Sequence, residues 1–148
     1  MKNIKTNFTL LEKIIVAMIM IVGFLGLTRY SIMFEKSRLI RAKMAIDDMR
    51  QLGQEHYLKN NSMDDLQNND VGVDNICTSA SFYRYWVRPG SDAGQVDFIA
   101  TRCTSGGKIP NAIRQYNVYL RCDYGTGKDT WHCNYQDDNS SCFGLSSS

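Results

Sequence analysis

Five cysteines are the residues of this chain with the most direct covalent chemistry. All of them lie in the second half of the sequence, at Cys77, Cys103, Cys122, Cys133 and Cys142. None forms a Cys-x-x-Cys pair, the spacing typical of zinc and dithiol redox sites. This placement favours disulfides formed in an oxidising, extracytoplasmic compartment. The odd count leaves at least one thiol free or paired between subunits. Of Cys77, Cys103 and Cys122, we expect two to pair, and we favour Cys103 with Cys122 because they lie on adjacent predicted strands.

The two histidines do not form a catalytic group. His56 falls in a predicted helix and His132 in a predicted strand, and neither accompanies a Ser or Cys nucleophile motif. The sequence also has no phosphate-binding glycine loop. We therefore predict that the chain is not an enzyme and needs no cofactor, with His56 as a packed or capping residue.

Acidic and basic clusters offer two binding chemistries, and the sequence argues against both. A polar loop contains four acids whose carboxylate oxygens could bind Ca²⁺: Asp64, Asp65, Asp70 and Asp74. Their spacing is not that of an EF-hand. We expect helix-capping or solvated acids and no metal site. Arg84 and Arg88 interleave with aromatic residues, a pattern that can bind single-stranded nucleic acid. We interpret them instead as the polar, solvent-facing side of a strand.

The overall charge also argues against nucleic-acid binding. The chain has 17 basic and 15 acidic residues. Lys2 and Lys5 account for this excess, so residues 8–148 contain 15 of each sign. A nearly neutral protein lacks the positive field that binds nucleic acid by bulk charge. We predict no specific nucleic-acid partner.

An almost unbroken apolar segment near the N-terminus contains an acid. Residues 14–27 carry no charge, and residues 8–27 would form a helix of about 30 Å, enough to cross a bilayer. Glu12 lies near the start of this segment, where a charge in hydrocarbon is costly. One interpretation is that Glu12 reaches the membrane interface. The other is that it has a functional partner.

The sequence NFTLLEKIIVAMIMIVGFLGL, residues 7–27, resembles the N-terminus of type IV pilins and the related pseudopilins. Their precursors carry a short basic leader, then Gly, then Phe-Thr-Leu-Ile-Glu and an apolar helix. Residues 8–12 here read Phe-Thr-Leu-Leu-Glu, and Asn7 stands where the family has Gly. Weaker resemblances follow, in LTRYSIMFEKSR (27–38), which lacks the family's proline, and in KNNSMDDL (59–66).

The resemblance implies a processing and assembly scheme. A prepilin peptidase would remove leader residues 1–7 by cutting between Asn7 and Phe8, and would methylate the new Phe8 amine. Glu12 would then pair with that amine on a neighbouring identical subunit. The resemblance also implies a disulfide between Cys133 and Cys142 that closes a C-terminal loop. The expected partners are further copies of the chain, the peptidase, the inner-membrane assembly machinery and, before assembly, the membrane.

The elements that must position these residues follow from periodicity. Apolar residues at three- and four-residue spacing predict an amphipathic helix over 29–59, with a stripe made of Leu39, Ala42, Ile46, Met49, Gly53 and His56. Residues 60–81 read as a loop. Period-two patterns predict strands at 82–88, 95–103, 115–124 and 129–135. Gly23 and Gly26 predict either a loosened helix or close helix packing.

We therefore expect an α+β fold, in which a long N-terminal helix packs on an antiparallel meander of about four strands. The expected organisation is leader 1–7, transmembrane and filament-core helix 8–29, and extracytoplasmic domain 30–148, with its loop at 60–81, sheet at 82–135 and C-terminal disulfide loop. The expected function is a structural pilus subunit for adhesion or motility, at the inner membrane as a precursor and on the cell surface when assembled. The alternatives are a type II secretion pseudopilin or a signal-anchored secreted binding domain.

Overall fold

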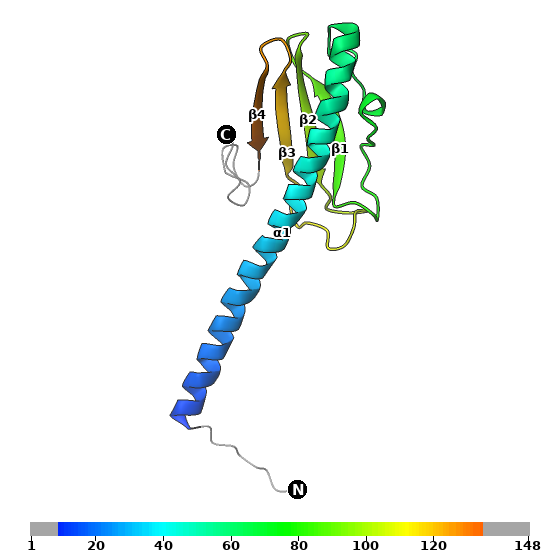
Figure 1. The fold of residues 1–148 in the computed structure, drawn as a ribbon. Helices are drawn as coiled ribbons and strands as arrows, with labels where there is room; N and C mark the ends of the chain where they lie inside the picture. The colour runs from blue at the N-terminus through cyan, green and yellow to red at the C-terminus, as the bar shows by residue number, and fades with distance from the viewer. Residues whose placement is uncertain (1–8, 135–148) are drawn as a thin grey trace. The chain divides into compact units, whose positions relative to one another are not determined.

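The computed structural model describes residues 9–134, except for the side chains of residues 27–29. Its elements are helix α1 (Leu10–Asn60), the short 3₁₀ helix η1 (Asn68–Val71), and strands β1 (Tyr83–Pro89), β2 (Gln95–Arg102), β3 (Asn117–Asp123) and β4 (Lys128–Cys133). The chain divides into two compact units, Met1–Glu35 and Lys36–Ser148, and α1 contributes to both. The predicted α+β class is confirmed, with one long helix and an open four-stranded sheet (Figure 1).

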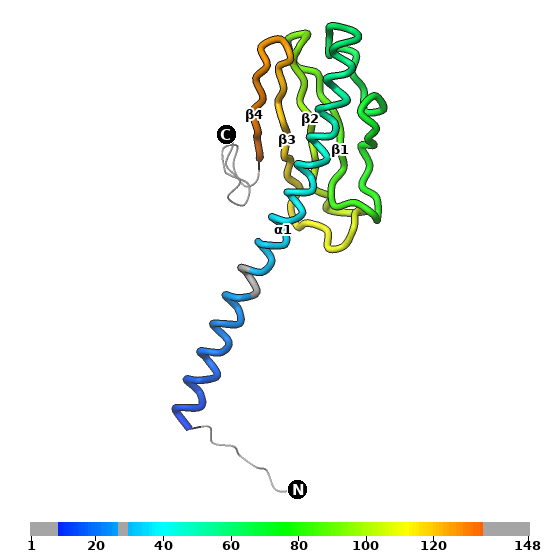
Figure 2. Tube along the Cα trace, in the orientation of Figure 1, coloured from blue at the N-terminus to red at the C-terminus, as the bar shows by residue number. Residues whose placement is uncertain are grey.

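The second unit is an antiparallel meander with one face covered by the C-terminal half of α1. The strands follow one another in the order β1-β2-β3-β4, each antiparallel to its neighbour. Figure 2 shows the chain leaving the end of α1, passing beside β1, and then forming the four strands in sequence. Residues 60–82 protect the edge of β1, where the Val87 amide donates a 2.9 Å hydrogen bond to the Asn68 side chain. The predicted loop thus contains one helical turn, η1.

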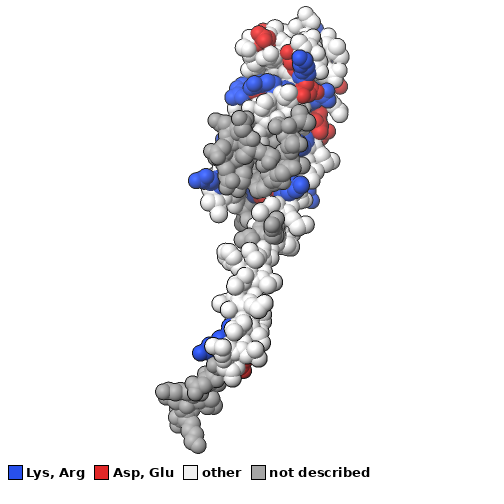
Figure 3. Space-filling model, turned by 90° about the vertical axis from the view of Figure 1, so that its left-hand side faces the viewer, with Lys and Arg blue, Asp and Glu red and all other residues white. Residues whose placement is uncertain are grey.

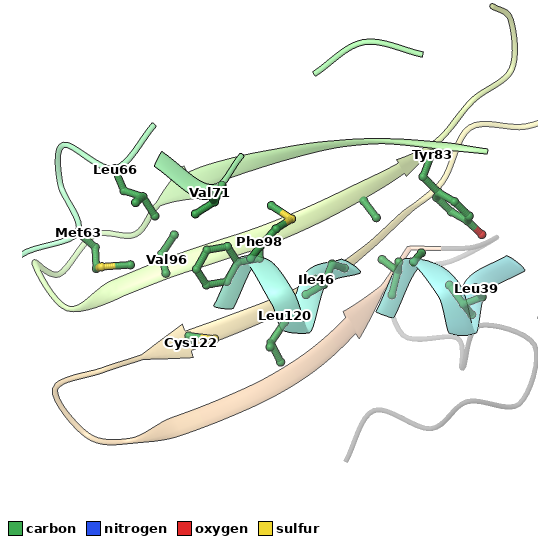
Figure 4. Close-up of a cluster of buried hydrophobic side chains, with 14 of the residues drawn as sticks. Leu39, Ile46, Met63, Leu66, Val71, Tyr83, Val96, Phe98, Leu120 and Cys122 are labelled. Carbon is green, nitrogen blue, oxygen red and sulfur yellow. The ribbon is translucent and has the colours of Figure 1, made fainter. Parts of the chain in front are cut away.

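The core lies between α1 and the sheet, as the helical stripe predicts. Leu39, Ala42, Ile46 and Met49 are all buried. The opposing sheet residues are those expected from period-two alternation, and Figure 4 shows Phe98 of β2 and Leu120 of β3 next to Ile46. Burying a side chain of this size contributes about 1.5 to 3 kcal/mol, so this stripe accounts for the attachment of the helix to the sheet.

Polar contacts from α1 extend the attachment to the last strand. The Arg50 guanidinium lies 2.6 Å from the Asp129 carboxylate, and the Arg50 carbonyl accepts a 2.8 Å hydrogen bond from the Tyr124 hydroxyl. The Lys43 ammonium lies 4.3 Å from the centre of the Trp131 ring. These contacts explain why the edge strand β4, in which no residue is fully buried, still lies on the helix.

Gly53 lies where α1 packs closely against Phe98 of β2. A Cβ atom at this position would lie 2.5 Å from Cζ of Phe98, which is far inside van der Waals contact. We therefore expect Gly53→Ala to lower the free energy of unfolding by about 1 to 3 kcal/mol, although Ala is the better helix former. Chemical denaturation followed by tryptophan fluorescence would measure the change.

Gly23 provides the matched control for Gly53, since it lies in the same helix and a Cβ atom at its position would meet no other atom within 4 Å. Gly23→Ala should leave the unfolding midpoint of the second unit unchanged. Equal effects of the two substitutions would contradict the close approach of α1 to Phe98.

Candidate assembly site

The first unit presents an apolar surface that no other described part of the chain covers. Large hydrophobic residues from Leu10 to Leu25 are all exposed, with Leu10 at 79% and Phe24 at 70%. None of the most apolar 18-residue stretch of α1 is buried. Figure 3 shows long uncharged stretches of surface along this unit. The segment is long enough and apolar enough to cross a membrane. A secretory signal sequence meets the same two criteria.

Glu12 is held by Thr9 at the start of α1. One carboxylate oxygen, Oε2, accepts hydrogen bonds from the Thr9 amide at 2.7 Å and from the Thr9 hydroxyl at 2.8 Å. The Thr9 hydroxyl oxygen in turn accepts a 3.4 Å hydrogen bond from the Glu12 amide. This reciprocal pair is a capping box, which satisfies amides at the helix start that have no partner within the helix.

The capping box is a role for Glu12 that the sequence reasoning missed. Its signal was present, because Thr9 and Glu12 have the Thr-x-x-Glu spacing that precedes an apolar helix. The box uses only one carboxylate oxygen. Within residues 9–134, Oε1 of Glu12 accepts no hydrogen bond, so the capped carboxylate keeps an acceptor for a donor from another molecule.

The predicted processing site lies outside the described residues. Asn7 and Phe8 both precede Thr9, where the description begins. The predicted cleavage, the methylation of Phe8, and the contact of its amine with Glu12 therefore stay predictions.

One disulfide prediction is wrong. Cys103 bonds to Cys77, with a Cα–Cα distance of 5.9 Å, and Cys122 is a buried free thiol. The antiparallel register explains the error, because Cys122 lies opposite Val96 near the start of β2, whereas Cys103 follows the end of that strand. The seven positions from Val96 to Cys103 span about 23 Å along an extended strand. Adjacent strands brought the two cysteines into one sheet but placed them at opposite ends.

The second predicted disulfide is only half described. Cys133, at the end of β4, is disulfide-bonded. Its predicted partner Cys142 lies outside the described residues. The Cys133–Cys142 bridge therefore stays a prediction.

A buried arginine organises the long connection between β2 and β3. Arg102 is 1% exposed. Its guanidinium donates to the carbonyls of Phe82 at 3.0 Å and Pro110 at 2.9 Å. Together with the Cys77–Cys103 bridge, this side chain anchors residues 103–116. Nothing in the sequence distinguishes Arg102 from a solvent-exposed arginine at the end of a strand, so its anchoring role could not be predicted.

Three further candidate residues, His56, Asp65 and Asp70, have local partners. His56 lies 3.1 Å from Asp65, and a hydrogen bond from His56 helps to hold the pKa of the Asp65 carboxyl below its ordinary value. The Asp70 carboxylate accepts a 2.8 Å hydrogen bond from the Gln67 amide and so caps η1. Among the described residues, no group of three or more His, Cys, Asp or Glu side chains is arranged to hold a metal ion.

Comparisons with protein-family models, curated proteins and solved structures find no match to this chain. What the structure establishes is a long N-terminal helix on a four-stranded antiparallel sheet with a disulfide, an arrangement compatible with a pilin-like fold.

Proposed function

We propose that this chain is the structural subunit of a type IV pilus, assembled through its N-terminal helix into a surface filament for adhesion or motility. The observation that carries the proposal is the combination of an entirely exposed apolar helical segment with one acid at its start. Such a surface needs a cover, first the lipid of the inner membrane and then the same segment of neighbouring subunits. The assembled filament is extracellular.

Glu12 supplies the specificity that apolar packing alone lacks. A carboxylate in an apolar bundle is costly unless an opposite charge meets it. The Phe8 amine of a neighbouring subunit, once the leader is removed, is a donor of the right charge for Oε1. Apolar contacts then provide the attraction between helices, and the ion pair sets their relative depth.

The experiment that tests the proposal is N-terminal sequencing and intact mass measurement of protein sheared from the cell surface. We expect a chain that starts at Phe8 and carries one additional methyl group, in filaments visible by electron microscopy. Asn7→Gly serves as the control, because it restores the residue that the pilin motif has at this position and should be processed at least as completely. A mature chain that starts elsewhere, or an unprocessed chain with no filaments, would refute the proposal.

A further inference from the structure

The face of the sheet opposite α1 carries an organised polar and aromatic surface that has no part in the assembly contacts proposed above. The register places its residues in rows that cross the strands. One row contains Trp86, Ile99, Tyr119 and His132, and the next contains Arg88, Asp97, Arg121 and Thr130. Ile99 and Asp97, both in β2, are buried.

Asp97 holds two arginines side by side. Its side chain is 6% exposed, whereas those of Arg88 and Arg121 are 51% and 48% exposed. Arg88 donates to Oδ2 from Nη2 at 2.6 Å and from Nε at 3.2 Å. Arg121 donates from Nε to Oδ1 at 2.8 Å and from Nη2 to Oδ2 at 3.1 Å. Burial alone would raise the pKa of Asp97, but these hydrogen bonds hold it below its ordinary value.

The two guanidiniums keep donors and charge for a ligand. Asp97 neutralises one of the two positive charges, so the cluster has a net charge of +1. Within the described part of the chain, Nη1 of Arg88 and Nη1 of Arg121 donate no hydrogen bond. The nearby Asp123 carboxylate accepts a 3.0 Å hydrogen bond from the Thr126 amide, and no hydrogen bond joins it to either arginine within the described residues. Paired guanidinium donors of this kind suit a carboxylate or a phosphate group.

The surroundings of the cluster suit a hydroxylated ligand. A cavity of about 260 Å³ lies beside the cluster, lined by both arginines and by the polar side chains of Ser91 and Gln95. The rings of Trp86 and Tyr119 lie 5.9 Å and 6.0 Å from Cζ of Arg88. The Trp86 indole donates a 3.0 Å hydrogen bond to the Thr101 hydroxyl, which donates to Asn117 at 2.7 Å. The site is therefore fixed across three strands before any ligand arrives.

We propose that this outer-face site, made of Arg88, Asp97 and Arg121 with the adjoining cavity, binds a sugar that carries a carboxylate or phosphate group. The guanidiniums bind the anionic group, and Ser91 and Gln95 provide hydrogen-bonding groups for hydroxyls. The cavity accommodates one such unit. A nucleic-acid strand is disfavoured, because its affinity depends on several phosphate contacts and this site offers a single net positive charge.

The test uses the full chain in detergent micelles, with the arginine Nε–H signals followed by NMR. Glucuronate and glucose 6-phosphate are the probes for the two anionic groups, and glucose is the neutral control. We expect saturable shifts of the Arg88 and Arg121 signals with at least one anionic sugar and none with glucose. The stronger of the two anionic probes identifies the group that the site prefers.

Arg88→Gln should weaken this binding by about tenfold or more, because hydrogen bonds from charged donors are worth at least that factor. The fold should persist, since Arg121 still pairs with Asp97. Arg84→Gln is the matched control, with the same charge change in the same strand but outside the cluster, and should bind as the wild type does. Absence of saturable shifts, equal losses in both variants, or tighter binding of a single-stranded oligonucleotide would each overturn the proposal.

Discussion

Glu12→Gln should leave the start of α1 intact and reduce the yield of filaments at least about tenfold. Glutamine at this position still accepts a hydrogen bond from the Thr9 amide, because capping boxes use Glu or Gln. What the substitution removes is the negative charge available to the amine of a neighbouring subunit. Removing one partner of a buried charge pair weakens binding by about 2 to 5 kcal/mol. A loss of about 1.4 kcal/mol already lowers the association constant between subunits tenfold. The measurement is the amount of sheared surface filament relative to total protein.

Thr9→Ala separates helix capping from subunit docking. It removes the capping hydroxyl, at a cost of about 0.5 to 2 kcal/mol to the helix start, and keeps the Glu12 carboxylate. We expect this variant to form filaments at a yield close to that of the wild type, and Glu12→Ala, which removes both functions, to form none. If instead Glu12→Gln assembles normally and Thr9→Ala does not, Glu12 acts only as a capping residue.

The double variant Cys77→Ser, Cys103→Ser should lower the free energy of unfolding of the second unit by about 3 to 4 kcal/mol. This magnitude follows from the sequence separation of 26 residues that the bridge closes, which the unfolded chain regains as conformational freedom when the bridge is removed. The long connection between β2 and β3 would then keep the hydrogen bonds of the Arg102 guanidinium and the backbone hydrogen bond from the Lys108 amide to the Ser81 carbonyl. Urea denaturation of the full chain in detergent, followed by tryptophan fluorescence, would measure the loss.

Cys122→Ala is the control for that experiment. Cys122 is buried but unbridged, so its replacement removes only one sulfur from the core and should cost about 1 kcal/mol. A second check is to alkylate the unreduced protein and measure its mass. Cys122 should be labelled only when the protein is unfolded, and Cys77 and Cys103 should not be labelled in either state. Labelling of Cys77 in the unfolded, unreduced chain would contradict the bridge.

The elements of the fold were predictable because their signals are local. The spacing of Leu39, Ala42, Ile46 and Met49 predicted which side of α1 is buried, and alternation predicted all four strands to within two residues at their ends. Side-chain direction repeats every 3.6 residues in a helix and every two in a strand, so a short stretch of sequence is sufficient to assign the buried face.

The partners of individual side chains were not predictable in this way. Alternation placed Arg88 on the outer face, but only the register of β1, β2 and β3 places Asp97 between Arg88 and Arg121. The same register separated Cys103 from Cys122. A strand pattern carries no information about how far a neighbouring strand is shifted, and that shift depends on turns and on packing against α1.

The sequence by itself therefore determined the apolar N-terminal segment, the acid at its start, the amphipathic helix and the meander, since each depends on neighbours within a few residues. The tertiary structure alone decided the Cys77–Cys103 bridge, the anchoring role of Arg102 and the paired arginines on Asp97. These contacts join residues between 8 and 26 positions apart. Their geometry exists only after the strands have paired, because register and loop path are properties of the whole sheet.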